Sequence, residues 1–386
     1  MRLKIKQFSV VHMTSVHDAS DVRIFQKECR SLAESGYRVS LVVPHSRSGT
    51  MDGVEIHVVP QPKSRFYRMT CTAWKVYRKA IEQDADLYHF HDPELIPAGL
   101  LLKCAGKKVI YDAHELYAVK ILCKPWIPVP FRYLASQLFS WCEHISSRFF
   151  DHVVTADRFT ANTFHSGRVS VVANYPFLPP IQEHSERTAA ARVAIYAGEL
   201  TSDRGLNVML EVARRLQSTD FELRLLGHFG CPEEEQRVCA APNIRYLGLL
   251  SHQDVLRELA NADVGLVLFQ PVPAYYYAGE NTIKLFEYMS RGLPVVVSSF
   301  PNSKRIVELA NCGLCVDPRD PQQAANVICE LLNNPELCRI LGENGRKAVL
   351  QDYNWEREFK TLLGIYRDVL GSTSQDVVGH TSIASI

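Results

Sequence analysis

The sequence predicts an α/β protein built from two doubly wound domains, each a largely parallel sheet covered by helices. Three observations support this fold class. Short apolar runs alternate with amphipathic stretches along both halves of the chain, as in parallel strands joined by crossover helices. A proline-rich stretch that begins at Pro176 separates the two halves. The length of 386 residues is sufficient for two domains of ordinary size.

The N-terminal half contains the first set of predicted elements. One helix is expected from Ser20 to Ser35, because apolar residues recur on one side of it and Gly36 follows. A second helix is expected to begin at Asp92, which can cap it, with Pro93 in the first helical position. The predicted strands are Ile5–His12, Arg38–Val43, Val54–Val59, Asp86–His91, Lys108–Asp112, His152–Thr155 and Ser170–Ala173.

The same alternation restarts after the proline-rich stretch and predicts a second sheet. Its strands are expected at Val193–Ala197, Glu222–Leu226, Ile244–Leu247, Val264–Phe269, Pro294–Val297 and Gly313–Val316. Its helices are expected at Arg204–Gln217, His252–Ala260, Thr282–Arg291, Pro321–Asn333, Pro335–Gln351 and Trp355–Leu370. The predicted organisation is a first domain over 1–175, a linker over 176–190, a second domain over 191–352, a C-terminal helix over 353–370 and a flexible tail over 371–386.

Composition restricts the class of protein. Hydrophobic content of 46% and charged content of 22% are globular values, and a formal charge of +1 gives no field that would favour nucleic acid. The first residues are interpreted as a strand rather than a signal peptide, and no apolar run approaches the ~18 residues of a membrane span. Eleven scattered cysteines favour free thiols in a reducing, cytoplasmic compartment. Cys312 and Cys315 lack a second pair at zinc-site spacing, so we expect structural thiols there.

The stretch from Gly279 to Pro294 is the most informative part of the chain. It predicts a polar loop, a short helix that Asn281 or Thr282 can cap, and a glycine-proline stop. The N-terminus of a helix offers unpaired N–H groups and a partial positive charge, which suit a phosphate. Glu287 follows within the helix, where its carboxylate could accept hydrogen bonds from a ribose diol. The pattern indicates a nucleotide-sugar site, although a capped surface helix would have the same residues.

Two strand tips add further signals of ligand binding. Gly198 ends one predicted strand, where a glycine lets a ligand approach the backbone, and Arg204 after it could hold a diphosphate in a forked geometry. Gly227 ends another strand, where a base or ribose could sit. The alternative for Arg204 is a surface arginine beside Asp203. The dinucleotide and P-loop glycine patterns are absent, which argues against NAD and ATP sites.

In their order along the chain, these motifs resemble the retaining glycosyltransferases of family four, which have the GT-B fold with two Rossmann-like domains facing across a cleft. The C-terminal half carries the resemblance through Gly198–Leu206, Tyr246–Gly248, Ala262–Leu266, Lys284–Val295 and Tyr353–Trp355. The N-terminal half carries it through His89–Pro93 and Val109–Glu115. The resemblance implies an acceptor-binding first domain, a donor-binding second domain and a last helix that returns to the first domain.

The resemblance also assigns roles to individual residues. Glu287 would bind the ribose hydroxyls of the donor, and His114 would reach the reacting sugar. The diphosphate would be held by Arg204 and the amides that begin the helix, so the expected catalytic residues are His114, Arg204 and Lys284. The expected residues of the donor site are Gly198, Arg204, Gly227, Glu280, Asn281, Thr282, Ile283, Lys284 and Glu287.

Two positions depart from the family's pattern. Glu199 stands where a second basic residue is common, and Lys284 could compensate for that loss. Gly279 stands where an acid is usual, eight residues before Glu287, with Glu280 one step closer. Whether Glu280 contacts the sugar is left open by the sequence.

The reaction that the resemblance implies is glycosyl transfer with retention at the anomeric carbon, from a UDP- or GDP-linked sugar, without a metal or another cofactor. The acceptor would be a glycan or a lipid-linked glycan in cell-surface polysaccharide assembly. Residues 120–150 mix aromatic and basic groups at roughly helical spacing. They could lie on the inner face of the cell membrane, or form an ordinary helix packed on the first domain.

Other functions of the same fold class are left open by these residues. A nucleotide-sugar 2-epimerase would convert the nucleotide sugar with no acceptor present. A sugar phosphorylase would depend on phosphate and on pyridoxal phosphate. An inactive sugar- or lipid-binding subunit would fit the departures at Glu199 and Gly279.

Overall fold

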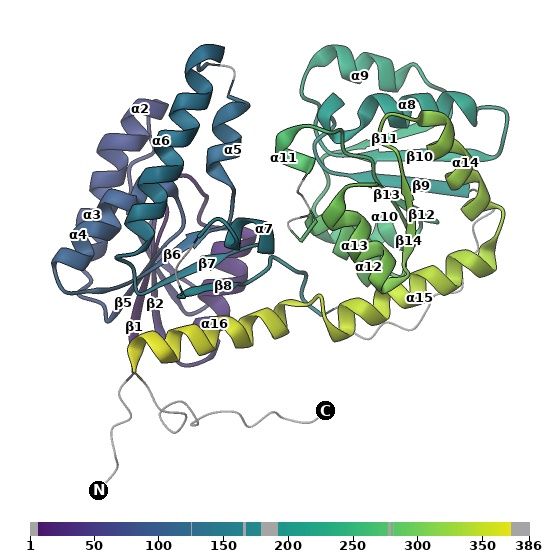
Figure 1. The fold of residues 1–386 in the computed structure, drawn as a ribbon. Helices are drawn as coiled ribbons and strands as arrows, with labels where there is room; N and C mark the ends of the chain where they lie inside the picture. The colour runs from purple at the N-terminus through teal and green to yellow at the C-terminus, as the bar shows by residue number, and fades with distance from the viewer. Residues whose placement is uncertain are drawn as a thin grey trace, which may run out of the picture. The chain divides into compact units, whose positions relative to one another are not determined.

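The structure of the chain is a computed structural model that describes residues 7–124, 126–164, 167–178, 192–276, 279–280 and 282–371. The chain divides into two compact units (Figure 1), of which unit 1 comprises Met1–Ala173 with Glu358–Ile386 and unit 2 comprises Asn174–Arg357. The start of the first predicted strand, most of the predicted linker and the predicted tail beyond residue 371 lie outside the described residues.

Unit 1 is built on an eight-stranded sheet in the order β3-β4-β2-β1-β5-β6-β7-β8. Neighbouring strands are parallel except for the antiparallel pair β3 and β4. The strand order reverses direction between β1 and β5, and ligands of doubly wound sheets bind outside the carboxyl ends of the strands at such a point. The strands are β1 (Ser9–Met13), β2 (Arg38–Pro44), β3 (Gly49–Met51), β4 (Val54–Val59), β5 (Leu87–Phe90), β6 (Lys108–Ala113), β7 (His152–Thr155) and β8 (Val169–Val171).

The helices of unit 1 begin with a segment that differs from the expected α-helix. The predicted helix from Ser20 to Ser35 forms a π-helix, η1 (Val22–Cys29), followed by a short α1 (Arg30–Glu34). Asp21 caps η1 by accepting bonds from the amides of Arg23 and Ile24. The other helical segments are α2 (Arg65–Tyr67), η2 (Arg68–Thr72), α3 (Ala73–Ile81), η3 (Pro93–Leu95), α4 (Ile96–Cys104), α5 (Tyr117–Leu122), α6 (Val129–Ser147), α7 (Arg158–Ala161) and, from Glu358 onward, α16 (Trp355–Leu370).

The two faces of the unit 1 sheet are chemically different. Successive residues of a strand point to opposite faces. Val11 and Met13 of β1 and Phe90 of β5 belong to the apolar core on one face. His12 and His89, directly paired across β1 and β5, point to the other face and are fully buried there. The sequence pattern therefore places an unusual set of buried polar groups in the middle of this domain.

Unit 2 is built on a six-stranded sheet in the order β11-β10-β9-β12-β13-β14. All neighbouring strands are parallel, and the order reverses direction between β9 and β12. Apolar residues of the central strands, such as Leu223 of β10 and Leu266 of β12, are fully buried in the core of this unit. The strands are β9 (Arg192–Ala197), β10 (Phe221–Leu226), β11 (Ile244–Gly248), β12 (Val264–Val267), β13 (Val295–Ser298) and β14 (Gly313–Val316).

One helix of unit 2 is tied directly to the middle of the sheet. Tyr288 of α12 packs where a side chain at Gly265 of β12 would collide with it. Its hydroxyl accepts a hydrogen bond of 2.9 Å from the amide of Ala197, the last residue of β9. The helical segments of unit 2 are η4 (Ser202–Arg204), α8 (Leu206–Arg215), α9 (Pro232–Cys239), α10 (His252–Ala260), α11 (Pro273–Tyr276), α12 (Ile283–Ser290), α13 (Pro301–Ala310), α14 (Pro321–Leu332) and α15 (Pro335–Gln351).

Several elements were not predicted from the sequence, and each has a local reason. The strand β3 is three exposed residues at the sheet edge, too short to show an alternating pattern. The helix α9 begins with Pro232 and three glutamates and buries only Val238, so it lacks a clear apolar stripe. The helix α13 also begins at a proline, soon after the end of β13, so its start is difficult to separate from the strand in the sequence. The predicted strands and helices of unit 2 otherwise agree with the observed ones to within a few residues.

Candidate functional site

Two glycines lie beyond adjacent strand ends of unit 2, near the point where the strand order reverses. Gly198 follows β9 with φ of +140°, and Gly227 follows β10 with φ of +133°. A Cβ at Gly227 would collide with the carbonyl of Gly198, and a Cβ at Gly198 would lie 2.5 Å from the ammonium of Lys284. Both positions therefore require glycine, because a side chain would be strained and would fill the space above the sheet.

Lys284 stands at the centre of this region. Its ammonium donates a hydrogen bond of 2.8 Å to the hydroxyl of Tyr196 and lies 3.9 Å from the centre of that ring. Burial and the nearby guanidinium of Arg204 hold the pKa of Lys284 well below its usual range, whereas Glu287 and Glu199 act in the opposite direction. A buried cation whose charge is disfavoured in this way is well suited to binding an anion.

Arg204 ends the turn η4 on the adjacent loop. Its Nε donates a hydrogen bond of 3.0 Å to the hydroxyl of Tyr275, and its Nη2 lies 3.1 Å from Oε2 of Glu199. Burial opposes its charge, but Tyr275, Tyr196 and Glu199 outweigh this and raise the pKa of Arg204. Arg204 is therefore a fixed cation, and Glu199 partly neutralises it.

The N-terminus of α12 contributes the third positive centre. Thr282 occupies the capping position, but its side chain makes no capping bond. Its buried Oγ1 has no hydrogen-bond partner within the described ranges. The first N–H groups of a helix have no intrahelical acceptor, so the amides of Ile283 and Lys284 provide donors at the positive end of the helix dipole.

Glu287 lies three residues after Lys284 on α12, which puts both side chains on neighbouring positions of one helix face. Its Oε1 lies 3.0 Å from Nε2 of His252, the first residue of α10. The side chain of Glu287 is 19% exposed, so its carboxylate can still meet a ligand.

Glu280 forms an ion pair with a residue of α13. Its carboxylate is buried and lies 2.7 Å from Nη2 of Arg305 on α13. The neighbouring Gly279 packs tightly, because a Cβ there would lie 2.5 Å from Cβ of Asn302. An acid at position 279 would therefore require Asn302 to move. The contact between Glu280 and a donor sugar stays a prediction, and Asn281 lies outside the described residues.

A separate cavity of about 270 Å³ lies in unit 1. It opens near the ends of β1, β5 and β6, where the strand order reverses. Among the residues that line it are His17, Arg68, His91, Asp92, Asp112, His114, Glu115, Tyr117, Lys120 and Lys124.

His114 is held at the wall of this cavity. Its Nδ1 lies 3.4 Å from Oδ2 of Asp112, and its ring is 5.2 Å from that of His17. Asp112 also accepts two hydrogen bonds of 2.9 Å from the guanidinium of Arg23 and one of 2.9 Å from Nδ1 of His91. Burial opposes the charge of Asp112, but Arg23 outweighs it and holds the pKa of that carboxyl well below its usual range. Asp112 is therefore a fixed carboxylate beside His114, whose Nδ1 makes no hydrogen bond within the described residues.

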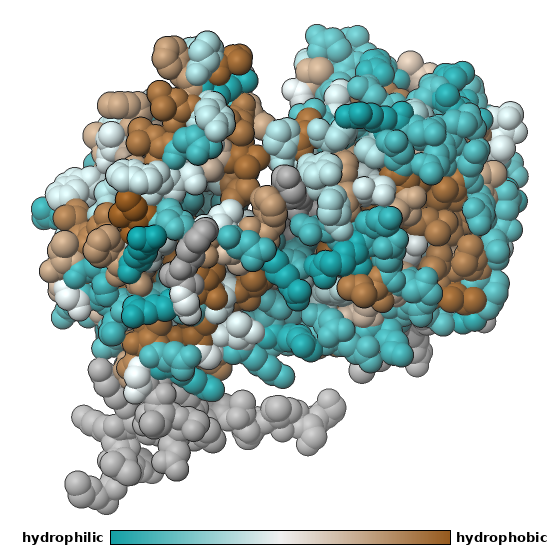
Figure 2. All heavy atoms as spheres, in the orientation of Figure 1, coloured by the Kyte–Doolittle hydropathy of each residue, from teal (hydrophilic) through white to brown (hydrophobic). Residues whose placement is uncertain are grey.

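The surface of unit 1 also carries a large apolar area. Figure 2 shows hydrophobic side chains gathered over α2, α5 and α6. Exposed members of this area are Phe66, Met69, Trp126, Val129, Phe131, Tyr133, Leu134, Leu138 and Trp141. Basic groups are interleaved with them, because the guanidinium carbon of Arg65 lies 3.6 Å from the centre of the Trp126 ring and the ammonium of Lys124 lies 4.9 Å from it. Across the described part of the chain, no helix is both long enough and apolar enough to span a bilayer.

Comparison with known proteins decides the family. A model described as "Glycosyl transferases group 1" matches residues 181–348, and one described as "Glycosyltransferase Family 4" matches residues 23–174. The chain belongs to the group 1 glycosyltransferases. It has the GT-B fold of that group, with two Rossmann-like domains.

Individual relatives of this glycosyltransferase are distant. EpsD of Bacillus subtilis, named as a glycosyltransferase, is 23% identical over 340 residues, which are 80% of this chain and 83% of EpsD. Two other curated relatives match over only 46% and 45% of their own length. Among solved structures, the sucrose-phosphate synthase of Thermosynechococcus elongatus matches with a TM-score of 0.75 at 17% identity, over 95% of this chain and 100% of that one. HepE of Anabaena, in complex with UDP and glucose, matches with a TM-score of 0.70 at 14% identity, over 94% and 100%.

The structure of the glycosyltransferase brings most of the expected donor residues together. Gly198, Gly227, Arg204 and Lys284 meet beyond the end of β9, and Thr282, Ile283 and Glu287 share a helix with Lys284. His114 lies in unit 1, where it lines the cavity of about 270 Å³.

Sequence reasoning missed the groups that hold these residues in place. Tyr196 and Tyr275 contact the two cations, and His252 contacts Glu287. Two of these three residues, Tyr196 and His252, lie in predicted elements. A tyrosine in a strand or a histidine at the start of a helix belongs to no sequence motif that would predict contact with a cation or a carboxylate. Only their position after folding identifies them.

Proposed function

We propose that this glycosyltransferase moves a sugar from a nucleoside-diphosphate sugar to a glycan or lipid-linked acceptor, with retention at the anomeric carbon. The observation that carries the proposal is the convergence of Lys284, Arg204 and the start of α12 beyond the end of β9. Three positive centres around two glycine-lined strand ends match the charge of a pyrophosphate.

The same residues account for the chemistry that we propose. The leaving nucleoside diphosphate gains negative charge as the glycosidic bond breaks, and preorganised donors stabilise such charge best in a dry site. The ammonium of Lys284 is held by Tyr196 and the guanidinium of Arg204 is held by Tyr275, so neither needs to reorganise during the step. We therefore propose transfer without a metal, because these groups supply the positive charge. No residue is assigned as a covalent nucleophile.

Glu287 is proposed to select the nucleotide. Its carboxylate would accept hydrogen bonds from the ribose diol while the helix end binds the diphosphate. HepE, whose structure contains UDP, supports a uridine nucleotide, and a GDP-linked sugar fits the same contacts. The proposal therefore covers UDP- and GDP-sugars.

The acceptor is proposed to enter the cavity of unit 1, where His114 would contact the reacting sugar. The lining mixes cationic groups (Arg68, Lys120, Lys124) with carboxylates, so it suits a hydroxyl-rich glycan that also carries negative charge. The exposed apolar area around Trp126 carries basic groups, which suits an anionic bilayer surface. We propose a peripheral location at the inner face of the cell membrane and a role in cell-surface polysaccharide assembly.

A screen of nucleotide sugars tests the proposal. UDP-, GDP- and ADP-sugars are added to the protein in a thermal-shift assay, and one class is expected to raise the melting temperature, since a ligand at ~100 times its Kd adds about 2.7 kcal/mol. The Arg204→Ala variant is expected to lose turnover by a factor on the order of 10²–10³. Normal turnover of that variant would reject the role of Arg204.

Three outcomes separate this activity from its alternatives. Conversion of the nucleotide sugar without an acceptor would indicate an epimerase. A requirement for inorganic phosphate and pyridoxal phosphate would indicate a phosphorylase. The absence of any nucleotide-sugar binding would indicate an inactive subunit, for which the pairing of Glu199 with Arg204 is the supporting observation.

A further inference from the structure

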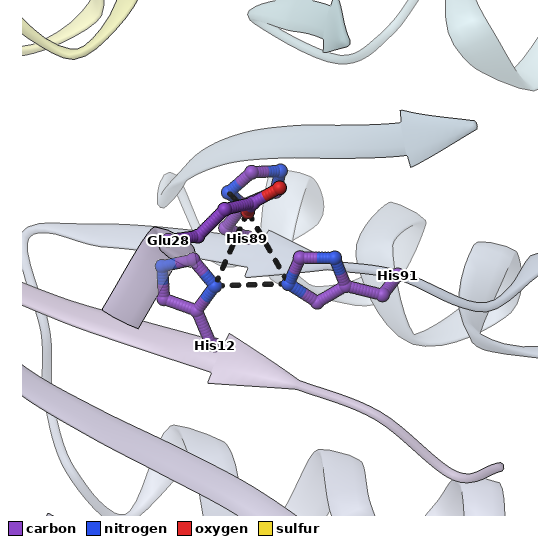
Figure 3. Close-up of side chains that lie close together, drawn as sticks. All are labelled: His12, Glu28, His89 and His91. Carbon is purple, nitrogen blue, oxygen red and sulfur yellow. Dashed lines mark hydrogen bonds and ion pairs between the residues drawn. The ribbon is translucent and has the colours of Figure 1, made fainter. Parts of the chain in front are cut away.

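Three histidines and one glutamate meet inside unit 1, whereas the expected donor residues belong to unit 2. They are His12 of β1, Glu28 of η1, His89 of β5 and His91 just after β5, and all four side chains are buried (Figure 3). One potential ligand atom from each lies within 4.8 Å of the other three. The catalytic proposal above uses none of these groups as a direct contact to the donor.

The distances suit one small cation. Oε2 of Glu28 lies 3.9 Å from Nδ1 of His12, 3.7 Å from Nδ1 of His89 and 3.9 Å from Nε2 of His91. Nδ1 of His12 lies 2.9 Å from Nε2 of His91. Ligands bound to zinc at about 2.0–2.1 Å in a tetrahedron are separated by about 3.3–3.4 Å. These four separations of 2.9–3.9 Å bracket that value, and the remaining ligand-atom pairs lie within 4.8 Å, so a contraction of the cluster by side-chain movement would complete the site.

Outside the histidine cluster, Glu28 is in ion-pair contact with Arg23 alone among the described residues. Neither of its oxygens makes a hydrogen bond within the described part of the chain, although both are shielded from water. Its Oε1 lies 3.3 Å from Nε of Arg23, but that nitrogen donates its hydrogen bond to Asp112 instead. A buried carboxyl without hydrogen bonds is costly, and a metal ion is one of the few groups that removes this cost.

Two of the three histidines have a polar partner for the nitrogen that points away from the cluster. The third, His89, has no hydrogen-bond partner for Nε2 within the described residues, and its Nδ1 lies 2.8 Å from the hydroxyl of Tyr366. Nδ1 of His91 donates to Asp112 at 2.9 Å, and Asp112 is itself held by Arg23. Nε2 of His12 lies 3.0 Å from the hydroxyl of Tyr366 on α16. Histidine ligands commonly donate their second N–H to a carboxylate or another oxygen, which fixes the tautomer and the ring.

We propose that His12, His89, His91 and Glu28 bind a divalent first-row transition metal ion, with zinc as the reference ion. Three imidazoles and one carboxylate form a nitrogen–oxygen donor set that zinc accepts in four-coordinate sites. Four protein ligands leave no open position, and the site is closed to solvent, so the ion is structural. It would join β1, β5 and η1 beneath α16 and is independent of the metal-free transfer proposed for the donor site.

The experiment uses the full chain with its affinity tag removed. Metal content is measured by mass spectrometry after gel filtration, and the melting temperature is measured with and without a strong chelator. The wild type is expected to contain about one zinc-class ion per chain and to lose thermal stability when the ion is extracted. Restoring zinc should restore the melting temperature, and cobalt substitution should give the intense visible absorption of a four-coordinate ion.

Two variants with the same substitution separate a metal site from a hydrogen-bond cluster. Glu28→Gln is expected to lose the ion and to melt at a lower temperature. Glu143→Gln is the matched control, because Glu143 is a buried carboxyl of unit 1 that bonds to Tyr111 and lies outside the histidine cluster. It is expected to keep the full metal content.

Two results would overturn the proposal. One is a wild-type protein that is folded but metal-free, both as purified and after incubation with zinc. The other is a Glu28→Gln variant that melts at the same or a higher temperature with unchanged metal content. That result would show Glu28 to be an unpaired buried carboxyl, which glutamine can replace without loss.

Discussion

The ammonium of Lys284 lies 2.8 Å from the hydroxyl of Tyr196 and directly faces the aromatic ring. Within the described part of the chain, no carboxylate is in ion-pair contact with this cation. The charge is therefore balanced only by a ring, a hydroxyl and more distant glutamates. A lysine held in this way is expected to destabilise the unliganded protein and to bind an anionic ligand strongly.

Replacing Lys284 by methionine should consequently have opposite effects on stability and binding. The variant keeps the length of the side chain but removes a buried cation, so its melting temperature without ligand should rise. Its affinity for UDP or GDP should fall by about 10- to 100-fold, the effect of losing a charged hydrogen bond of ~1.5–3 kcal/mol. Both are measured by thermal shift and calorimetry. Lys304→Met, at an exposed position of α13, is the control and should change neither quantity. A destabilised variant with wild-type affinity would contradict this account.

The lowered pKa of Lys284 predicts that nucleotide binding is coupled to proton uptake. The free protein releases this proton at a lower pH than an ordinary lysine does, and a bound diphosphate would raise the pKa again. Between the two pKa values the complex holds more protons than the free protein, so affinity should fall as pH rises through that window. Calorimetry in two buffers of different ionisation enthalpy measures the uptake. The uptake should disappear in Lys284→Met, and its persistence there would assign the proton to another group.

We expect Glu287 to contribute to nucleotide binding only through the ribose hydroxyls. Glu287→Gln is expected to weaken binding of UDP or GDP by about 10-fold or more, because a charged acceptor is worth ~1.5–3 kcal/mol. The same substitution should have little effect on a 2′,3′-dideoxy nucleotide, which lacks the diol. His252→Ala, which removes the neighbour of Glu287, is the control and should cost less. An equal loss of affinity for both nucleotides would show that Glu287 does not bind the ribose hydroxyls.

The exposed apolar area of unit 1 should bind anionic bilayers. Flotation with vesicles containing anionic lipid is expected to recover the wild type but much less of the Trp126→Ser/Phe131→Ser double variant, because both aromatic side chains are largely exposed beside basic groups. Leu309→Ser, an exposed apolar residue on α13 of unit 2, is the control and should float as the wild type does. If the double variant floats as well as the wild type does, the exposed apolar area around Trp126 does not bind the membrane.

Much of the fold could be predicted because its signals are local. The parallel strands appear as short apolar runs, and helices such as α10, α15 and α16 show their caps and apolar faces in sequence order. The segment η1 differs from its prediction, because it is a π-helix and because Arg23 and Glu28 are buried in it together with the predicted apolar residues. Charged residues at those positions argue for an exposed helix face, and only partners from β5 and β6 make their burial tolerable.

Most strands and helices, the family, and the short motifs around Gly198, Arg204 and Lys284 could be recognised in the amino-acid sequence, because each depends on residues close together along the chain. The contacts of Tyr196 with Lys284, of Glu280 with Arg305, and of His12 with His89, His91 and Glu28 became visible only in the folded chain. These contacts join residues up to about ninety positions apart, and their distances follow from strand pairing and helix packing, for which no local pattern exists.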